Sequence, residues 1–262
     1  MSASLDQEVG IYRSHTFAAS TAKTYASQRA MFIKFCSQLN IAPVPLSQAD
    51  LGRYIAFLSQ RLTFASVRQY LNVVRLFHLE AGLHNPLDNN WYVASILKGV
   101  RRVKGDSSNP KLPITIDLLK VMFQRLDFHV SLDRSFWAAC LVGFFSFFRK
   151  SNLLVPSHDL FDPARHLCAS DAEFTSQGVI LTVRWSKVIQ FRQRILQIPL
   201  PIITDSPFCP STMLLQLNFD HPHGNLPVPL FRFKAGCKVV PLTSSIFTTK
   251  LHDCLRACGI GT

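Results

Sequence analysis

The sequence predicts a mainly helical protein with a small antiparallel β-sheet, divided into two domains. Three observations predict this: apolar residues recur at helical spacing through residues 18–102, a polar and basic segment follows at 103–114, and strand-like runs lie within 115–262. Hydrophobic residues make up 48% of the 262 residues, which suffices for two modest cores and argues against general disorder. Residues 1–17 show no clear pattern and are expected to form an N-terminal segment.

Four amphipathic helices are expected in the first domain. Ser20 is the expected cap of the first helix, and the SQAD segment at 47–50 resembles a capping box that starts the second. The third helix stops near Gly82, and the fourth begins after Asn89 or Asn90. Their apolar faces contain, in order, Tyr25, Phe32, Phe35 and Leu39; Leu51, Tyr54, Ile55 and Leu58; Val67, Tyr70, Leu71, Val74 and Phe77; and Ile96, Leu97 and Val100. Short loops between such helices predict a compact bundle.

Two helices are expected to open the second domain. Thr115 can cap a helix that runs to about Leu126, and an apolar helix then ends near Phe148. The longest apolar stretch, Phe136 to Phe148, is too short to cross a bilayer. It is therefore interpreted as a buried core helix.

The rest of the second domain combines strands with two more helices. The segments GVILTVRW (178–185) and RILQIPL (194–200) are strand-like, and the basic segment SKVIQFRQ between them suits a hairpin turn. A helix with Pro210 in its first turn follows, then a short extended PLFRF segment. A final amphipathic helix is expected to be closed by Gly259.

The charge balance points to a polyanionic partner. The formal net charge is +12, and it is not concentrated in a tail. Residues 1–110 hold 12 basic and 6 acidic side chains, and residues 111–262 hold 16 and 10, so that each part carries about +6. Nucleic acid is the commonest partner of such a protein.

No metal site or other cofactor is expected. The seven cysteines are scattered, with no CxxC pair, and the first residues do not form a secretory signal. Reduced thiols in a cytosolic or nuclear protein are therefore expected. Cys209, His221, His223 and Cys237 are of ligand type, but their spacing is not that of a zinc site.

Five segments carry a family resemblance. TAKTYASQRAMFIKFC (21–36), TFASVRQYLNVVRLFHLEAG (63–82), LPIT (112–115), FFSFFRKSNLL (144–154) and VRWSKVIQFRQR (183–194) resemble tyrosine recombinases of eukaryotic mobile elements, the Crypton and DIRS-type group. The first two resemble the SAM-like core-binding domain of that family, here residues 18–102, and LPIT resembles the entry to its catalytic domain. The last two match the motifs around its first catalytic arginine and its catalytic lysine.

The resemblance implies catalytic roles for Arg149 and Lys187. A guanidinium fork can meet two non-bridging oxygens of the scissile phosphate, where charge builds during attack by a tyrosine. Lys187 on the hairpin turn would protonate the leaving 5′ oxygen as general acid. The sequence departs from the family pattern at Phe147, where glycine is usual, and at Asn152, where many members have glutamate.

The remaining catalytic motifs of the family are not found. The segment HDCLR (252–256) has its arginine one position too far for a His-x-x-Arg box, and all five tyrosines precede Arg149. The expectation is a DNA-binding protein derived from a tyrosine recombinase, with a truncated catalytic domain at 115–262 that is inactive in strand exchange. Two alternatives stay open: an incomplete reading frame of an active site-specific recombinase, and a domesticated non-enzymatic DNA-binding or protein-interaction module.

The resemblance also implies DNA contacts on the helical domain, because the helix at 63–82 lies against the major groove in the family. Arginine and lysine would bind phosphates, and glutamine can read base edges. The expected DNA-binding residues are Lys23, Arg68, Gln69, Arg75, Lys98, Arg101, Arg102 and Lys104. The expected partner is double-stranded DNA in the nucleus, without a membrane; members of the family act on DNA as tetramers.

Overall fold

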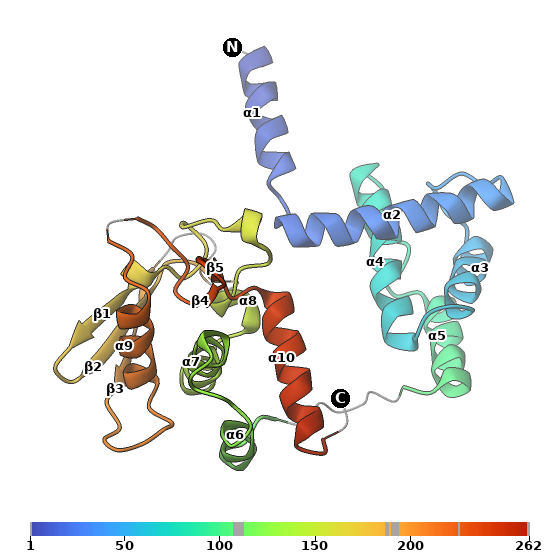
Figure 1. Cartoon of the computed structure of the whole chain (residues 1–262). Helices are drawn as coiled ribbons and strands as arrows, with labels where there is room; N and C mark the ends of the chain where they lie inside the picture. The colour runs from blue at the N-terminus through green and yellow to red at the C-terminus, as the bar shows by residue number, and fades with distance from the viewer. Residues whose placement is uncertain (1, 107–112, 187–188, 190–193, 225, 261–262) are drawn as a thin grey trace. The chain divides into compact units, whose positions relative to one another are not determined.

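The computed structural model divides into two compact units, unit 1 (Met1–Lys111) and unit 2 (Leu112–Thr262) (Figure 1). It describes residues 2–106, 113–186, 189, 194–224 and 226–260. Ten α-helices, a three-stranded antiparallel sheet and a two-stranded hairpin lie within these residues. The mainly helical class with a small antiparallel sheet is confirmed.

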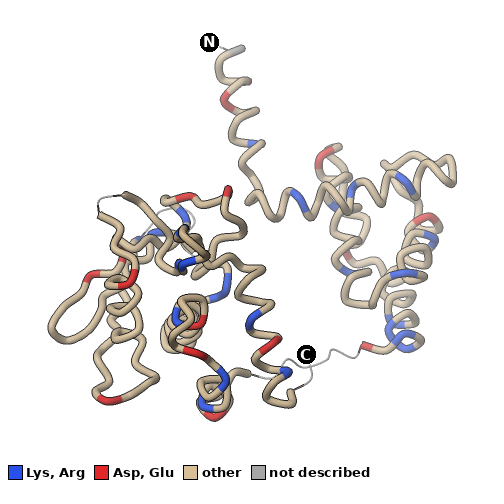
Figure 2. The backbone as a smooth tube through the Cα atoms, in the orientation of Figure 1, with Lys and Arg blue, Asp and Glu red and all other residues tan. Residues whose placement is uncertain are grey.

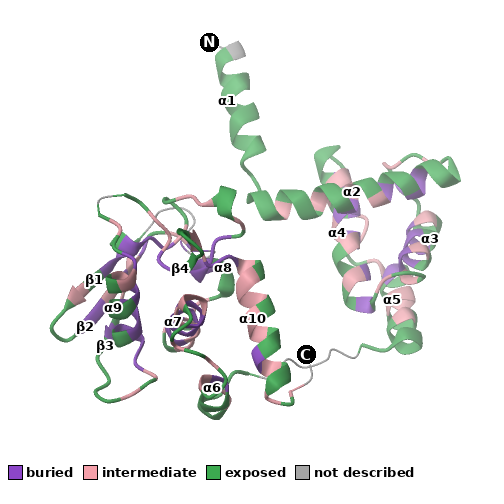
Figure 3. Ribbon diagram, viewed as in Figure 1, coloured by how far each residue is buried: buried purple, intermediate pink, exposed green. Residues whose placement is uncertain are grey.

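Unit 1 consists of helices alone in its described part. They are α1 (Ser2–Ser14), α2 (Ala19–Leu39), α3 (Gln48–Ser59), α4 (Phe64–Glu80) and α5 (Trp91–Lys104). Helix α1 lies where no element was expected, and residues 4–14 are all exposed (Figure 3). Helix α5 runs through Lys104, so the first two residues of the expected linker at 103–114 are helical; residues 107–112 lie outside the described part.

The helix starts in unit 1 follow from local hydrogen bonds. The Ser47 side chain accepts from the Asp50 amide at 3.1 Å, and that of Asn90 accepts from the Val93 amide at 3.1 Å. The expected cap at Ser20 is wrong: Ala18 is the N-cap, two residues earlier, and α2 begins at Ala19 without a side-chain cap. Alanine is the best helix former, which allows the helix to include it.

The core of unit 1 forms between α2, α3, α4 and α5. Phe32 packs edge-on against Tyr54 and Phe77, and the first two of these side chains are fully buried. The apolar faces expected from the sequence contribute most of this core, although Leu39 is exposed at the end of α2.

Unit 2 mixes helices with short strands. Its elements are α6 (Ile116–Phe123), α7 (Ser131–Phe145), α8 (Lys150–Leu153), β1 (Ala172–Thr175), β2 (Gly178–Val183), β3 (Leu196–Pro201), α9 (Pro210–Asp220), β4 (Arg232–Ala235), β5 (Lys238–Pro241) and α10 (Ser244–Ala257), with 3₁₀ turns at His158–Leu160 and Ala169–Asp171. Strand order in the larger sheet is β1-β2-β3, antiparallel throughout. The apolar helix α7 is the centre of the core, where Trp137 is fully buried.

Several boundaries in unit 2 differ from expectation. Helix α6 is capped by Thr115 as expected, but it ends at Phe123 rather than near Leu126. Helix α7 ends at Phe145 rather than Phe148, because the chain turns into the left-handed conformation at Phe147. Strand β2 ends at Val183, so that Arg184 and Trp185 follow the strand, and β3 begins at Leu196.

No helix in the described part of the chain is both long and apolar enough to cross a membrane.

Candidate nucleic-acid interface

The basic residues at the end of α5 are exposed, but they differ in whether their side chains already have partners. Arg101 pairs with Asp106 at 2.8 Å and lies over the ring of Phe64, with its guanidinium carbon 5.8 Å from the ring centroid. The Lys104 ammonium donates to the Leu62 carbonyl at 2.8 Å. These two cations are therefore already engaged within unit 1.

Lys98 and Arg102 differ from their neighbours on the same helix. Both are exposed, and neither forms an ion pair or a hydrogen bond from its side chain to any described residue. Four residues apart, they lie on one face of α5, one turn from each other. This face presents to solvent two positive charges without a partner in the described part of the chain. Figure 2 marks the Lys and Arg positions along the backbone in blue.

Helix α4 presents the other expected contact residues. Arg68 and Gln69 are exposed, and Arg68 lies along an open groove of about 200 Å³ between α4 and α5. Arg75 is also exposed and donates to the Asn72 side-chain oxygen at 3.2 Å. Asn72 in turn donates to the Tyr25 hydroxyl at 2.9 Å, so its amide is used inside the bundle. Lys23, near the start of α2, is exposed.

Arg149 lies at the start of a short helical turn, α8, four residues after the end of the buried helix α7. It is exposed, and its backbone carbonyl accepts from the Asn152 amide at 2.8 Å at the beginning of α8. No described residue bonds to its side chain. The next residue, Lys150, donates to the Thr248 hydroxyl of α10 at 2.9 Å. Of the two adjacent cations, only Arg149 has a side chain without a described partner.

The structure explains why glycine suits position 147. The Phe148 amide donates to the Gly143 carbonyl at 3.1 Å, and the Phe147 amide donates to the Phe144 carbonyl at 3.5 Å. These are the two bonds of a Schellman motif, whose C′ residue is left-handed and usually glycine. Phe147 occupies that place with φ 53° and is 94% exposed.

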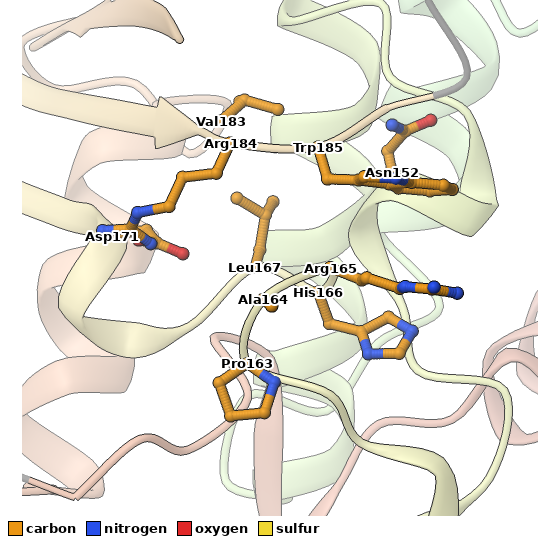
Figure 4. Close-up of a pocket in the computed structure, with 10 residues that line it drawn as sticks. All are labelled: Asn152, Pro163, Ala164, Arg165, His166, Leu167, Asp171, Val183, Arg184 and Trp185. Atoms are coloured by element: carbon orange, nitrogen blue, oxygen red, sulfur yellow. The ribbon is translucent and has the colours of Figure 1, made fainter. Parts of the chain in front are cut away.

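A small hollow lies beside the α8 turn, lined by Asn152, Pro163, Ala164, Arg165, His166, Leu167, Asp171, Val183, Arg184 and Trp185 (Figure 4). It has room for about 10 Å³ of solvent, roughly one water molecule. The Arg165 guanidinium lies 5.9 Å from the centroid of the Trp185 ring. The hollow is therefore too small for an organic ligand, and Arg165 at its rim already pairs with Asp162 at 3.4 Å.

The charged groups around this hollow have distinct roles. Asp171 is buried and pairs with Arg184 just after β2, and its other oxygen accepts from the Cys168 amide at 2.8 Å. His166 Nδ1 accepts from the Asp162 amide at 2.9 Å, which leaves the proton of the neutral ring on Nε2. Burial lowers the pKa of His166, so the neutral form is favoured at pH 7.

The second expected catalytic residue, Lys187, lies outside the described residues. The position of Arg149 relative to Lys187 is therefore not described. Arg165, His166 and Trp185 were not singled out from the sequence. Arg165 and Trp185 are 20 positions apart, and no local spacing signals that the hollow brings them together.

All five tyrosines belong to unit 1. Tyr54 is fully buried, and burial raises the pKa of its hydroxyl, which makes it a poor nucleophile. The Tyr25 hydroxyl accepts the bond from Asn72. Tyr12 and Tyr92 are exposed, so the five tyrosines do not share one environment.

The described residues contain no group of three or more histidine, cysteine or acidic side chains placed to hold a metal ion. No protein-family model matches the chain, and no curated protein matches its sequence. The resemblance to tyrosine recombinases therefore depends on the motifs themselves.

Proposed function

We propose that the chain is a DNA-binding protein derived from a tyrosine recombinase and that it binds double-stranded DNA through the exposed cations of unit 1. The observation that carries the proposal is the unpaired state of Lys98 and Arg102 on one face of α5. Because these two cations have no acidic partner, they can bind phosphates without first breaking an ion pair. Phosphate neutralisation releases counterions, which supplies most of non-specific affinity.

Helix α4 would add sequence preference to this affinity. Arg68 and Gln69 are exposed next to each other, and arginine and glutamine can form bidentate hydrogen bonds with guanine and adenine in the major groove. The Asn72 side chain is less available, because its amide group donates to the Tyr25 hydroxyl and its oxygen accepts from Arg75. Arg149 in unit 2 is a further candidate for a phosphate contact, because its side chain has no described partner, whereas Arg165 already pairs with Asp162 at 3.4 Å.

The test is fluorescence anisotropy of a labelled 20-base-pair duplex at several salt concentrations. The double variant Lys98→Ala/Arg102→Ala should lower affinity about tenfold near 50 mM salt and reduce the slope of log K against log salt by roughly 2. The matched control is Arg53→Ala/Lys120→Ala, which removes the same charge from helices where both cations already pair, with Asp50 and Asp117.

The control should change affinity much less than the α5 variant. Absence of duplex binding by the wild-type chain at low salt would refute the proposal. Equal losses in both double variants would show that only net charge matters and would remove α5 as the interface.

A further inference from the structure

Trp91 is an exposed tryptophan at the first position of α5. Its exposed fraction is 80%, whereas Trp137 is fully buried and Trp185 is partly buried in the hollow of unit 2. The side chain of Trp91 forms no hydrogen bond or ring contact with any described residue. A large apolar ring in water is unfavourable, and tryptophan is enriched at binding surfaces for that reason.

Helix geometry keeps this ring away from the core of its unit. The buried or partly buried residues of α5 that pack into unit 1 are Val93, Ile96, Leu97 and Val100. At 100° per residue they centre on one side of the helix, and Trp91 lies on the opposite side. The ring cannot reach that core by a change of rotamer.

Trp91 shares its face with the two unpaired cations. Trp91, Ser95, Lys98 and Arg102 recur at intervals of four, three and four residues, which places them in one row of about 16 Å along the helix. No acidic residue lies in α5. The Asp88 carboxylate, three positions before Trp91, accepts from the Asn85 amide group at 2.6 Å. We call Trp91, Lys98 and Arg102 the α5 row.

The flat ring of Trp91 and the two unpaired cations on the same face match the chemistry of a nucleic acid strand with unpaired bases. Nucleic acid strands with unpaired bases present a π-face and, on the same strand, a series of negative phosphates. Base stacking on an aromatic side chain contributes about 1–3 kcal/mol per base as measured by alanine substitution. In an intact duplex the faces of the bases are covered by their neighbours, so a surface tryptophan has no base to stack on.

We propose that the α5 row binds nucleic acid at an unpaired base, which stacks on Trp91 while Lys98 and Arg102 hold the adjacent phosphates. This inference deepens the proposed function and rests on it, because the same two cations would bind duplex DNA. It adds a preference for distorted or single-stranded sites, and that preference depends on Trp91 alone.

The experiment compares two probes with the whole chain: a labelled 20-base-pair duplex and the same duplex with a central two-thymine bulge. We expect the wild type to bind the bulged probe about tenfold more tightly. Trp91→Ala should abolish this preference and change affinity for the intact duplex less than twofold, whereas Trp91→Phe should retain most of it. Phe219→Ala is the control, since Phe219 is 86% exposed on α9 of unit 2 and should affect neither probe.

Tryptophan fluorescence provides a second readout. The bulged probe should quench part of the wild-type emission, and this part should be lost in Trp91→Phe. Duplex binding with no preference for the bulge, or a preference that survives in Trp91→Ala, would overturn the inference and leave the proposed function standing. Absence of binding to both probes would overturn both.

Discussion

The two units hold similar formal charge, but some of their cations are used differently. Residues 1–111 hold 13 basic and 6 acidic side chains, and residues 112–262 hold 15 and 10, so that the units carry +7 and +5. On α5 of unit 1, Lys98 and Arg102 are exposed and unpaired. In unit 2, by contrast, several cations hold the fold together: Arg134 pairs with Asp220 at 2.8 Å, and Lys250 pairs with Asp133 at 2.6 Å.

Arg232 shows the difference most clearly. It is only 6% exposed, and its guanidinium donates to three backbone carbonyls, those of His221, Pro229 and Leu230. Burial lowers the pKa of this arginine, because a charge without solvent is unfavourable. It is therefore a structural residue that ties β4 to the end of α9, and it is not available to DNA.

The net charge of a unit therefore does not show which of its cations can bind a phosphate. Whether a cation can bind a phosphate depends on what it already contacts, and a sum over the sequence does not contain that information. The comparison separates cations that hold the fold together, such as Arg232, from cations that stay exposed without a described partner, such as Lys98 and Arg102.

The largest expected effect tests the structural role of Arg232. Arg232→Met should lower the free energy of unfolding of unit 2 by about 2–4 kcal/mol, because two buried carbonyls and one partly buried carbonyl lose their donor. Urea unfolding monitored by near-UV circular dichroism, to which buried Trp137 contributes, measures it.

The matched control for Arg232 is Arg102→Met on the free face of α5. This change should alter stability by less than about 0.5 kcal/mol, since Arg102 has no described partner. Equal effects of the two variants would erase the distinction between the units.

A smaller effect is expected from pH, through His221. Burial lowers the pKa of this histidine, and nearby Arg232, Arg134 and Lys234 lower it further, although Asp220 opposes them. The unfolded chain then binds a proton more readily than the folded one below pH 6.5, so stability should fall as pH decreases through that value. The slope is at most about 1.4 kcal/mol per pH unit for one histidine.

Stability curves of wild type and His221→Gln between pH 7.5 and 5 measure this dependence. The variant should lose part of the acid destabilisation, and the rest is assigned to His166, whose pKa is also lowered. His84→Gln, on an exposed residue of unit 1, serves as the control. An unchanged slope in His221→Gln would contradict the prediction.

The smallest effect concerns the turn before Arg149. Phe147→Gly should stabilise unit 2 by roughly 0.5–1 kcal/mol, because the left-handed conformation is strained for phenylalanine and natural for glycine. The gain in thermal unfolding temperature should be absent in Phe145→Gly, where the residue is helical. A loss of stability in Phe147→Gly would mean that the exposed ring makes a contact that offsets the strain.

Structural features that depend on residues a few positions apart in the chain, such as helix caps and apolar helix faces, were predictable from the sequence. The caps at Ser47, Asn90 and Thr115 each bond to an amide three residues ahead, so the sequence contains both partners. The same holds for the apolar faces of α3 and α4, because helical spacing alone groups their residues. Boundaries failed where a turn overrode hydrophobicity, as at the end of α7.

The availability of each cation was decided by the tertiary structure. Lys104 is engaged because the Leu62 carbonyl, 42 positions away, lies within hydrogen-bond reach. Arg232 is buried because the end of α9 approaches β4. Sequence alone determined two charged, helix-rich regions and the residue types that can meet a polyanion. Which of those residues are free to do so depends on contacts between distant segments, and these arise only when burial of the apolar faces brings the segments together.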